Sequence, residues 1–194
     1  QVKFFKEALT ATDQLRLRVA FALSQIFVVS GTTIQQPSSM TPYLNLLKER
    51  AFTNYRQILY NVTLNPAMGD YLDMVDNEKR NPLTGVPPNE NYAREILQLF
   101  SIGTVMLNQD GTPQLDAYGK TIPSYDQDTI KGFAQAFTGW TYALQTGQPS
   151  LVHNPPYYLK PMVLYRDASG LDVTHDKNEK KVLNYATAQL TVLP

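Results

Sequence analysis

The sequence predicts a mainly α-helical protein, with a bundle-like helical core, an irregular or β-hairpin excursion, and a few short strands in the last third. Apolar residues recur at helical spacing in successive segments of residues 1–140. Most of these segments follow an Asp, Asn or Thr that can cap a helix, several with a proline in the first turn. The connections between most of the segments are short, as in helical bundles.

Four helices are expected in residues 13–72. The first runs from Asp13 to about Val29 and is apolar over a broad face, which indicates a central helix with neighbours on several sides. The residues expected to face inward on it are Leu15, Val19, Ala22, Leu23, Ile26 and Phe27. The other three helices are expected to open at Thr41-Pro42, Asn54 and Asn65-Pro66.

A long polar loop separates these helices from the next one. Residues 76–88 combine prolines and a glycine with polar residues, and loops of this length often carry function. Asn89 is then expected to cap a helix that ends near Gly103, because a glycine is the usual residue just after a helix end.

The excursion is expected at residues 104–125, which contain two turn signals with glycine. The first signal, Asp110-Gly111, favours an ordinary turn over a calcium-binding loop, because the closing glutamate of such a loop is absent. Ser124 or Asp126 is expected to cap the last helix, which ends at Gly139.

The character of the chain changes after residue 140, where prolines and tyrosines become frequent. Short strands are expected at residues 157–159 and 162–165. We therefore expect a helical core region over residues 1–145 and a Pro/Tyr-rich extension over 146–194. The chain begins with Gln, not Met, and residues 186–194 are apolar without a stop signal. We expect a middle segment of a longer protein, whose missing parts or another chain cover exposed core.

The composition excludes several classes of function. Lys plus Arg and Asp plus Glu both number 17, so the formal net charge is zero, and no basic face that would bind nucleic acid is visible. The absence of cysteine excludes disulfides, thiolate metal sites and a cysteine nucleophile. No apolar run approaches the roughly 20 residues that a membrane-spanning helix needs.

The helix expected from Asn89 carries the densest group of polar side chains. Its polar arc, at about 100° per residue, comprises Glu90, Asn91, Arg94, Glu95, Gln98 and Ser101. Glu90 and Arg94 have the spacing of an ion pair on a helix. Two interpretations stay open. The arc is a solvent-exposed face, or it lines a cleft in which Arg94 keeps one carboxylate ionised while the other acts as acid or base.

Two further positions attract attention. His175 beside Asp176 has the residue types of a general base or a metal ligand, but no second histidine lies at ligand spacing, so no metal site is predicted. A surface histidine is the alternative. Trp140 follows the end of a predicted helix, where it either fills the core or offers an aromatic platform to a sugar ring.

Several segments together resemble one bacterial family, known as domain of unknown function 1800. The segments that carry the resemblance are residues 13–30, 54–72, 88–103, 133–140 and 175–183. The resemblance implies a largely helical, periplasmic or extracellular protein, often encoded beside a family related to sulfatases and alkaline phosphatases. Many members carry Glu and His where this chain has Gln98 and Phe100, which weakens a metal role for that helix.

Two functional hypotheses follow. The first is an extracytoplasmic hydrolase that acts on a glycan or another polymer, with an unknown cofactor. Its catalytic residues would be Glu90, Arg94, Glu95, His175 and Asp176, which the fold must bring to one pocket. Its ligand-binding residues would be Asn89, Asn91 and Trp140. The second is a non-catalytic scaffold that binds the co-encoded phosphatase-like protein or works in a surface assembly, since the many Tyr and Phe residues suit a contact surface.

Overall fold

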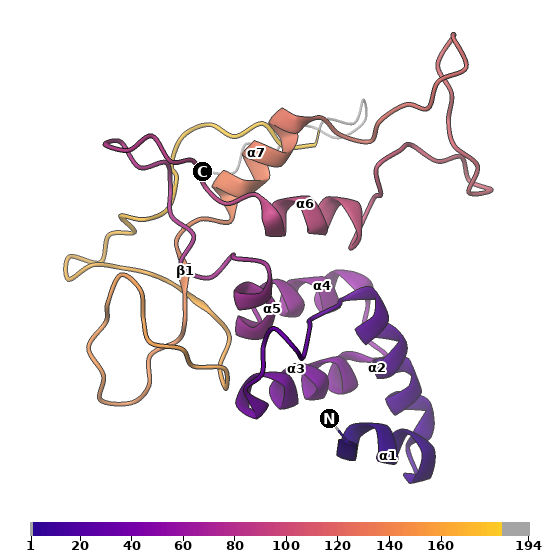
Figure 1. Ribbon diagram of the computed structural model, residues 1–194, viewed down its shortest axis with the longest axis horizontal. Coiled ribbons are helices and arrows are strands. Elements are labelled where there is room, and N and C mark those ends of the chain that lie inside the picture. The colour runs from indigo at the N-terminus through magenta and orange to yellow at the C-terminus, as the bar shows by residue number, and fades with distance from the viewer. Residues whose placement is uncertain (1, 184–194) are drawn as a thin grey trace. The chain divides into compact units, whose positions relative to one another are not determined.

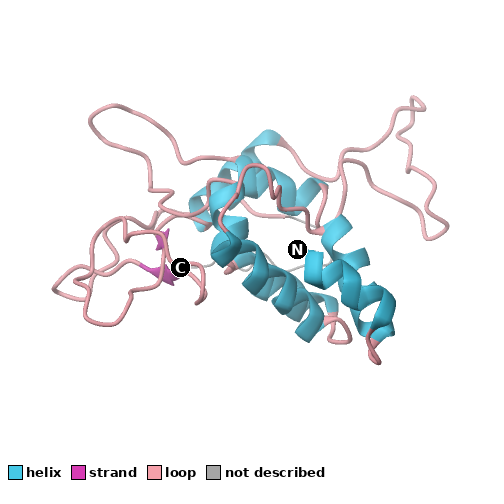
Figure 2. Ribbon diagram, turned by 60° about the horizontal axis from the view of Figure 1, so that its bottom comes forward, coloured by secondary structure: helices cyan, strands magenta, loops and turns pink. Residues whose placement is uncertain are grey.

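The computed structural model describes residues 2–183, which contain seven helices and a single two-stranded sheet, so the predicted mainly α fold is confirmed (Figures 1 and 2). The chain forms two compact units that alternate along the sequence. Unit 1 comprises the described residues 2–76 and 140–173, and unit 2 comprises 77–139 and 174–183. The predicted division into domains at residue 145 stays a prediction, and residues 186–194 lie outside the described part.

Unit 1 is built on five helices, coloured indigo to magenta in Figure 1: α1 (Val2–Thr10), α2 (Gln14–Ile26), α3 (Pro37–Arg50), α4 (Tyr55–Thr63) and α5 (Pro66–Tyr71). Helix α3 packs against α2, α4 and α5, whereas α2 packs against α1 and α3. The role of central helix, which the sequence assigned to α2, therefore falls to α3.

The predicted inner face of α2 is wrong in part. Leu23 and Phe27 are buried as expected, but Leu15 is 68% exposed and Ile26 is 44% exposed. The buried residues of the helix itself are Leu17, Ala20 and Leu23. A repeat of apolar residues identifies the buried face of a helix only if polar residues occupy the opposite face. The apolar surface of α2 is too broad for that.

Two of the predicted helix starts are confirmed in unit 1, the start of α3 is wrong, and helix α1 was not predicted. The side chains of Asn54 and Asn65 cap α4 and α5 by accepting hydrogen bonds from Gln57 N and Ala67 N, each at 2.9 Å. Helix α3, however, begins at Pro37, so Pro42 lies inside it and not in its first turn. The extended residue Gln36 is the N-cap of α3, and Pro37 takes the first-turn position that the sequence assigned to Pro42.

The rest of unit 1 is a long loop region held by a short antiparallel sheet. Strand β1 (Trp140–Thr141) pairs with β2 (Val163–Leu164), so the strand predicted at 162–165 is confirmed over two residues. The strand predicted at 157–159 is absent from the structure. Prolines flank it on both sides and lack the N–H groups that a sheet needs. Tyr158 is instead buried, and its hydroxyl donates to Asp70 Oδ2 at 2.5 Å.

Unit 2 is centred on two helices, α6 (Asn91–Gln98) and α7 (Gln127–Ala136). Their shared core consists of Ala93, Leu97, Ile130 and Ala134. Of the two predicted caps for α7, Asp126 is correct, because its carboxylate accepts from Thr129 N at 2.8 Å. Glu90 occupies the N-cap position of α6, but its side chain makes no capping hydrogen bond; the predicted cap, Asn89, accepts from Asn91 N at 2.8 Å.

Residues 104–125 form the predicted excursion, which is irregular and not a regular hairpin. Hydrogen bonds between Met106, Gln114 and Ile122 join its three extended segments. Asp110 and Gly111 form the predicted turn, in which the Asp110 carboxylate accepts from Thr112 N at 2.9 Å. Figure 1 shows this excursion as the long loop between α6 and α7.

Residues 174–183 cross α7 without forming a helix or strand, and we call this segment the strap. Lys181 Nζ lies 2.5 Å from Asp126 Oδ2, and the side chain of Lys180 is buried. The backbone of Lys181 lies directly against Gly132 in the middle of α7. The strap can approach α7 this closely only because Gly132 has no side chain.

The ion pair between the strap and Asp126 should make the stability of unit 2 dependent on pH. The Lys181 ammonium, followed by the N–H and hydroxyl of Thr129, holds the pKa of the Asp126 carboxyl well below its ordinary value of 3.8. A carboxyl whose pKa is lowered on folding stabilises the protein above its ordinary pKa, and this contribution is lost as the pH falls through the folded value. The Asp126→Asn variant, which keeps a capping side chain, should therefore be less stable than wild type near neutral pH.

That difference in the free energy of unfolding should shrink as the pH falls below 3.8. Urea unfolding of both proteins, followed by circular dichroism across this pH range, measures it. A difference that stays constant with pH would show that the ion pair with Lys181 does not form in solution.

Within residues 2–183, no helix is long and apolar enough to cross a membrane. Large apolar side chains are exposed on the first two helices, including Phe5 at 49% and Leu9 at 72%. The prediction that other segments or another chain cover such surfaces stays a prediction.

Candidate functional site

The N-terminal end of α6 holds the first group of predicted site residues. Glu90 occupies the N-cap position, Asn89 precedes it, and Asn91 is the first helical residue. The Oε2 atom of Glu90 accepts hydrogen bonds from Arg94 Nη2 at 3.0 Å and from Gln127 Nε2 at 2.7 Å. Because Gln127 opens α7, one carboxylate oxygen joins the two helices. Two donors, one of them charged, therefore converge on one oxygen of Glu90.

Glu95, one turn further along α6, has a different environment. Its Oε2 atom is buried and forms no hydrogen bond within the described part of the chain. The charges of Arg94 and Glu95 also act on the pKa of the Tyr125 hydroxyl. Burial raises the pKa of Tyr125, the Arg94 charge opposes this rise, and the Glu95 charge adds to it. A buried carboxylate oxygen without a donor is costly, so it is a position that calls for a hydrogen-bonding ligand.

His175 is held in one orientation by the segment that follows α7. Its Nδ1 atom lies 2.8 Å from the Thr138 carbonyl oxygen, to which it can donate only when Nδ1 carries a proton. When the ring is neutral, Nε2 is then the nitrogen that can accept a proton. A Cβ atom on Gly139 would lie 3.0 Å from the His175 Cβ, so glycine permits this close approach.

Asp176 is 2% exposed and its groups are used by the fold. Its carboxylate accepts from Asn178 N at 2.8 Å and from Gln135 Nε2 at 3.3 Å. Its own N–H donates to Thr138 Oγ1 at 2.8 Å. These bonds make Asp176 the residue that fixes the start of the strap against the end of α7. A direct catalytic role for Asp176 stays a prediction.

Asn77 links the neighbourhood of His175 to the start of α6. Its side-chain amide accepts from Asn89 N at 2.8 Å and donates to Asn89 O at 3.1 Å. Its carbonyl oxygen accepts from Gly139 N at 2.8 Å. The N-terminal end of α6 and the segment that holds His175 are therefore joined through one buried residue of unit 2.

The predicted catalytic residues thus all belong to unit 2, but they form two groups. Within residues 2–183, neither His175 nor Asp176 forms a hydrogen bond or ion pair with Glu90, Arg94 or Glu95. Their convergence on one pocket stays a prediction. Trp140, predicted to bind ligand, is the first residue of β1 in unit 1 and is half-buried.

Four residues of these groups were not singled out from the sequence: Asn77, Tyr125, Gln127 and Thr138. Each acts through contacts with residues far away in the sequence, which a periodicity does not reveal. Thr138 lies within a segment that carries the family resemblance, which was the one available signal. Among the described residues, no group of three or more His, Asp or Glu side chains is placed to hold a metal ion.

The fold and the contacts of Glu90 and Glu95 define a mainly α-helical protein with two glutamates of unlike environment at one short helix. The family comparison agrees with the resemblance noted in the sequence. The chain belongs to the family described as Protein of unknown function (DUF1800), whose model matches residues 1–191. The comparisons with curated proteins and with solved structures found no match.

Proposed function

We propose that this chain is a hydrolase that acts outside the cytoplasm on a glycan or another polymer, with Glu95 as the group that transfers the proton. One observation carries the proposal. Two carboxylates on α6 differ in environment, because Glu90 is paired with Arg94 and Gln127 while Glu95 has a buried oxygen without a donor. Pairs of carboxyl groups whose surroundings differ in this way perform acid and base roles in glycoside hydrolysis.

The roles follow from the two environments. Glu95 gives a proton to the oxygen of the leaving group as the bond to the sugar carbon breaks. Glu90, held by Arg94 and Gln127, balances the positive charge that develops on the sugar ring. Water supplies the hydroxyl that completes the product, and its proton returns to Glu95. His175, held through Nδ1, offers Nε2 as a second proton acceptor, and Asn89 and Asn91 are the proposed ligand-binding residues at the start of α6.

Removal of the Glu95 carboxylate should abolish most of the activity and leave the fold intact. The Glu95→Gln variant keeps the shape but cannot transfer a proton, so turnover of a polysaccharide that the wild type hydrolyses should fall about a hundredfold or more. Release of reducing ends from a panel of neutral and acidic polysaccharides measures the turnover. Circular dichroism checks the fold.

The matched control is Glu179→Gln, which removes an exposed carboxylate of the same unit and should leave turnover unchanged. Equal activity of wild type and Glu95→Gln would refute the assigned role. A wild-type protein that cleaves none of the polysaccharides in the panel would contradict the proposed function itself.

A scaffold that binds the co-encoded phosphatase-like protein is the second candidate. It is favoured by the exposed apolar side chains of α1 and α2, among them Phe5, Leu9 and Leu15. Serine at Phe5 and Leu9 should then abolish co-elution of the two proteins in size-exclusion chromatography. The location outside the cytoplasm is part of both proposals and rests on the family resemblance.

A further inference from the structure

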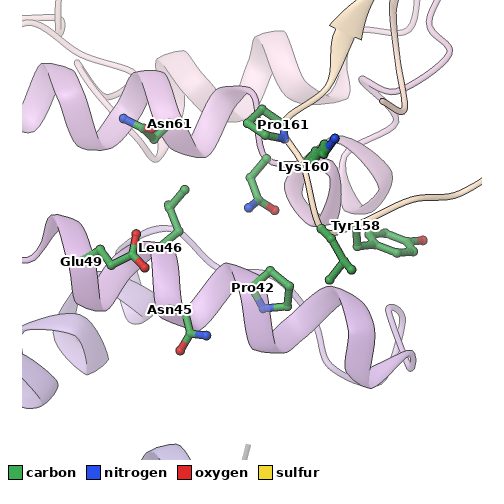
Figure 3. Close-up of a pocket in the computed structure, with 10 residues that line it drawn as sticks. Pro42, Asn45, Leu46, Glu49, Asn61, Tyr158, Lys160 and Pro161 are labelled. Atoms are coloured by element: carbon green, nitrogen blue, oxygen red, sulfur yellow. The ribbon is translucent and has the colours of Figure 1, made fainter. Parts of the chain in front are cut away.

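Unit 1 contains a groove to which neither hypothesis assigns a role, and we propose that it binds a short neutral saccharide. Helices α3 and α4, the start of α5, and residues 158–161 form its walls (Figure 3). The groove has a volume of about 310 Å³, within the range of small-molecule sites in proteins. The candidate hydrolase residues lie in unit 2, so this proposal does not rest on the proposed function.

The groove follows one face of α3. Pro42, Leu46 and Glu49 are spaced by four and three residues, which places them on the same side of the helix. Seven residues of helix span roughly 10 Å. This length suits two linked sugar rings better than a single small metabolite. In Figure 3 the Leu46 side chain points from α3 toward the helix that carries Asn61, with the Glu49 carboxylate beside it.

Several polar groups of the groove have no partner in the fold. Within residues 2–183, the Glu49 carboxylate and the Lys160 ammonium form no hydrogen bond or ion pair. Asn61 donates through Nδ2 to Gln57 O, which leaves its Oδ1 available. Asn65 accepts through Oδ1 from Ala67 N, which leaves its Nδ2 available. The groove therefore offers two acceptors, Asn61 and Glu49, and two donors, Asn65 and Lys160.

This mixture identifies the chemistry of the ligand. A sugar hydroxyl both donates and accepts, so a saccharide satisfies alternating donors and acceptors without carrying a charge. The charges of Glu49 and Lys160 cancel, which disfavours a polyanion such as a nucleic acid or an acidic glycan. The apolar faces of Pro42, Leu46 and Pro161 can contact the C–H faces of sugar rings.

The proposal is tested on the whole chain with three neutral disaccharides, namely cellobiose, maltose and N,N′-diacetylchitobiose. Saturation-transfer NMR and isothermal titration measure their binding. At least one of them should bind. Asn61→Ala and Glu49→Ala should each weaken that binding about three- to tenfold, as expected for the loss of one or two hydrogen bonds.

The matched control is Gln57→Ala, which removes an exposed amide from the same helix one turn away from Asn61 and should leave binding unchanged. The peptide trialanine is the competing probe, because a peptide backbone also alternates donors and acceptors. Three results would each overturn the proposal: no disaccharide binds, binding survives both groove variants, or trialanine binds while the disaccharides do not. Glu95→Gln should bind the disaccharide like the wild type, which separates this outcome from that of the proposed hydrolase.

Discussion

Replacing Gly132 with alanine should destabilise the protein by about 3 kcal/mol or more, although the same change in an exposed helix normally stabilises by about 1 kcal/mol. Gly132 lies inside α7, where alanine is the better helix former. A Cβ atom at this position would overlap the carbonyl oxygen of Lys181 in the strap. That neighbour is backbone and cannot rotate away as a flexible side chain would.

The strap must therefore separate from α7 in this variant. Its separation would expose Lys180, which is buried in the wild type, and break the pair between Lys181 and Asp126. Urea unfolding gives the loss of stability, and hydrogen exchange should show faster exchange of residues 174–181. Lys131→Ala, on the exposed side of the same helix, is the control and should change stability by less than about 1 kcal/mol. A stabilised Gly132→Ala protein would show that the strap does not contact α7.

Replacing Thr138 with valine should cost about 3 kcal/mol, although valine has nearly the same shape. Thr138 is fully buried, and its hydroxyl donates to Gln135 O at 2.7 Å and accepts from Asp176 N at 2.8 Å. Valine would leave the buried N–H of Asp176 without an acceptor. An unsatisfied buried donor costs more than the net gain of an ordinary hydrogen bond.

Thr138→Ser is the matched variant, because it keeps the hydroxyl and loses only a methyl group, which costs about 1 kcal/mol. The free energy of unfolding of the two variants, measured in urea, distinguishes the hydrogen bonds from packing. If valine proves no less stable than serine, the hydroxyl does not hold the strap. The His175 ring should also lose order in the valine variant, visible as broadening of its imidazole NMR signals, because Asp176 no longer anchors the adjacent backbone.

Local signals in the sequence predicted most of the helix boundaries. Asn54, Asn65 and Asp126 were identified as caps because a short polar side chain before an apolar segment satisfies the first free N–H groups of a helix. Gly139 has a positive φ angle of 90° shortly after the end of α7, as expected. These features depend on a few neighbouring residues, so they can be read without the fold. The predicted helix end near Gly103 is wrong, because α6 ends at Gln98.

The sequence was less informative where the decision depends on distant contacts. It placed the start of α3 at Thr41, because proline in a first turn is common, but the helix contains Pro42. It selected the wrong face for part of α2, because tertiary neighbours decide which side of a helix with a broad apolar surface is covered. It also gave no sign that Trp140 and His175 belong to different units.

The sequence by itself determined the mainly helical class, the family, and the polar face of α6 with Glu90, Arg94 and Glu95. Only the tertiary structure gives Glu90 and Glu95 different environments. Gln127, which is 37 residues from Glu90 in the sequence, supplies the second donor to Glu90, while folding buries an oxygen of Glu95 without one. Helical periodicity places both carboxylates within one polar arc, but the hydrogen bonds and burial of each depend on segments that only folding brings near.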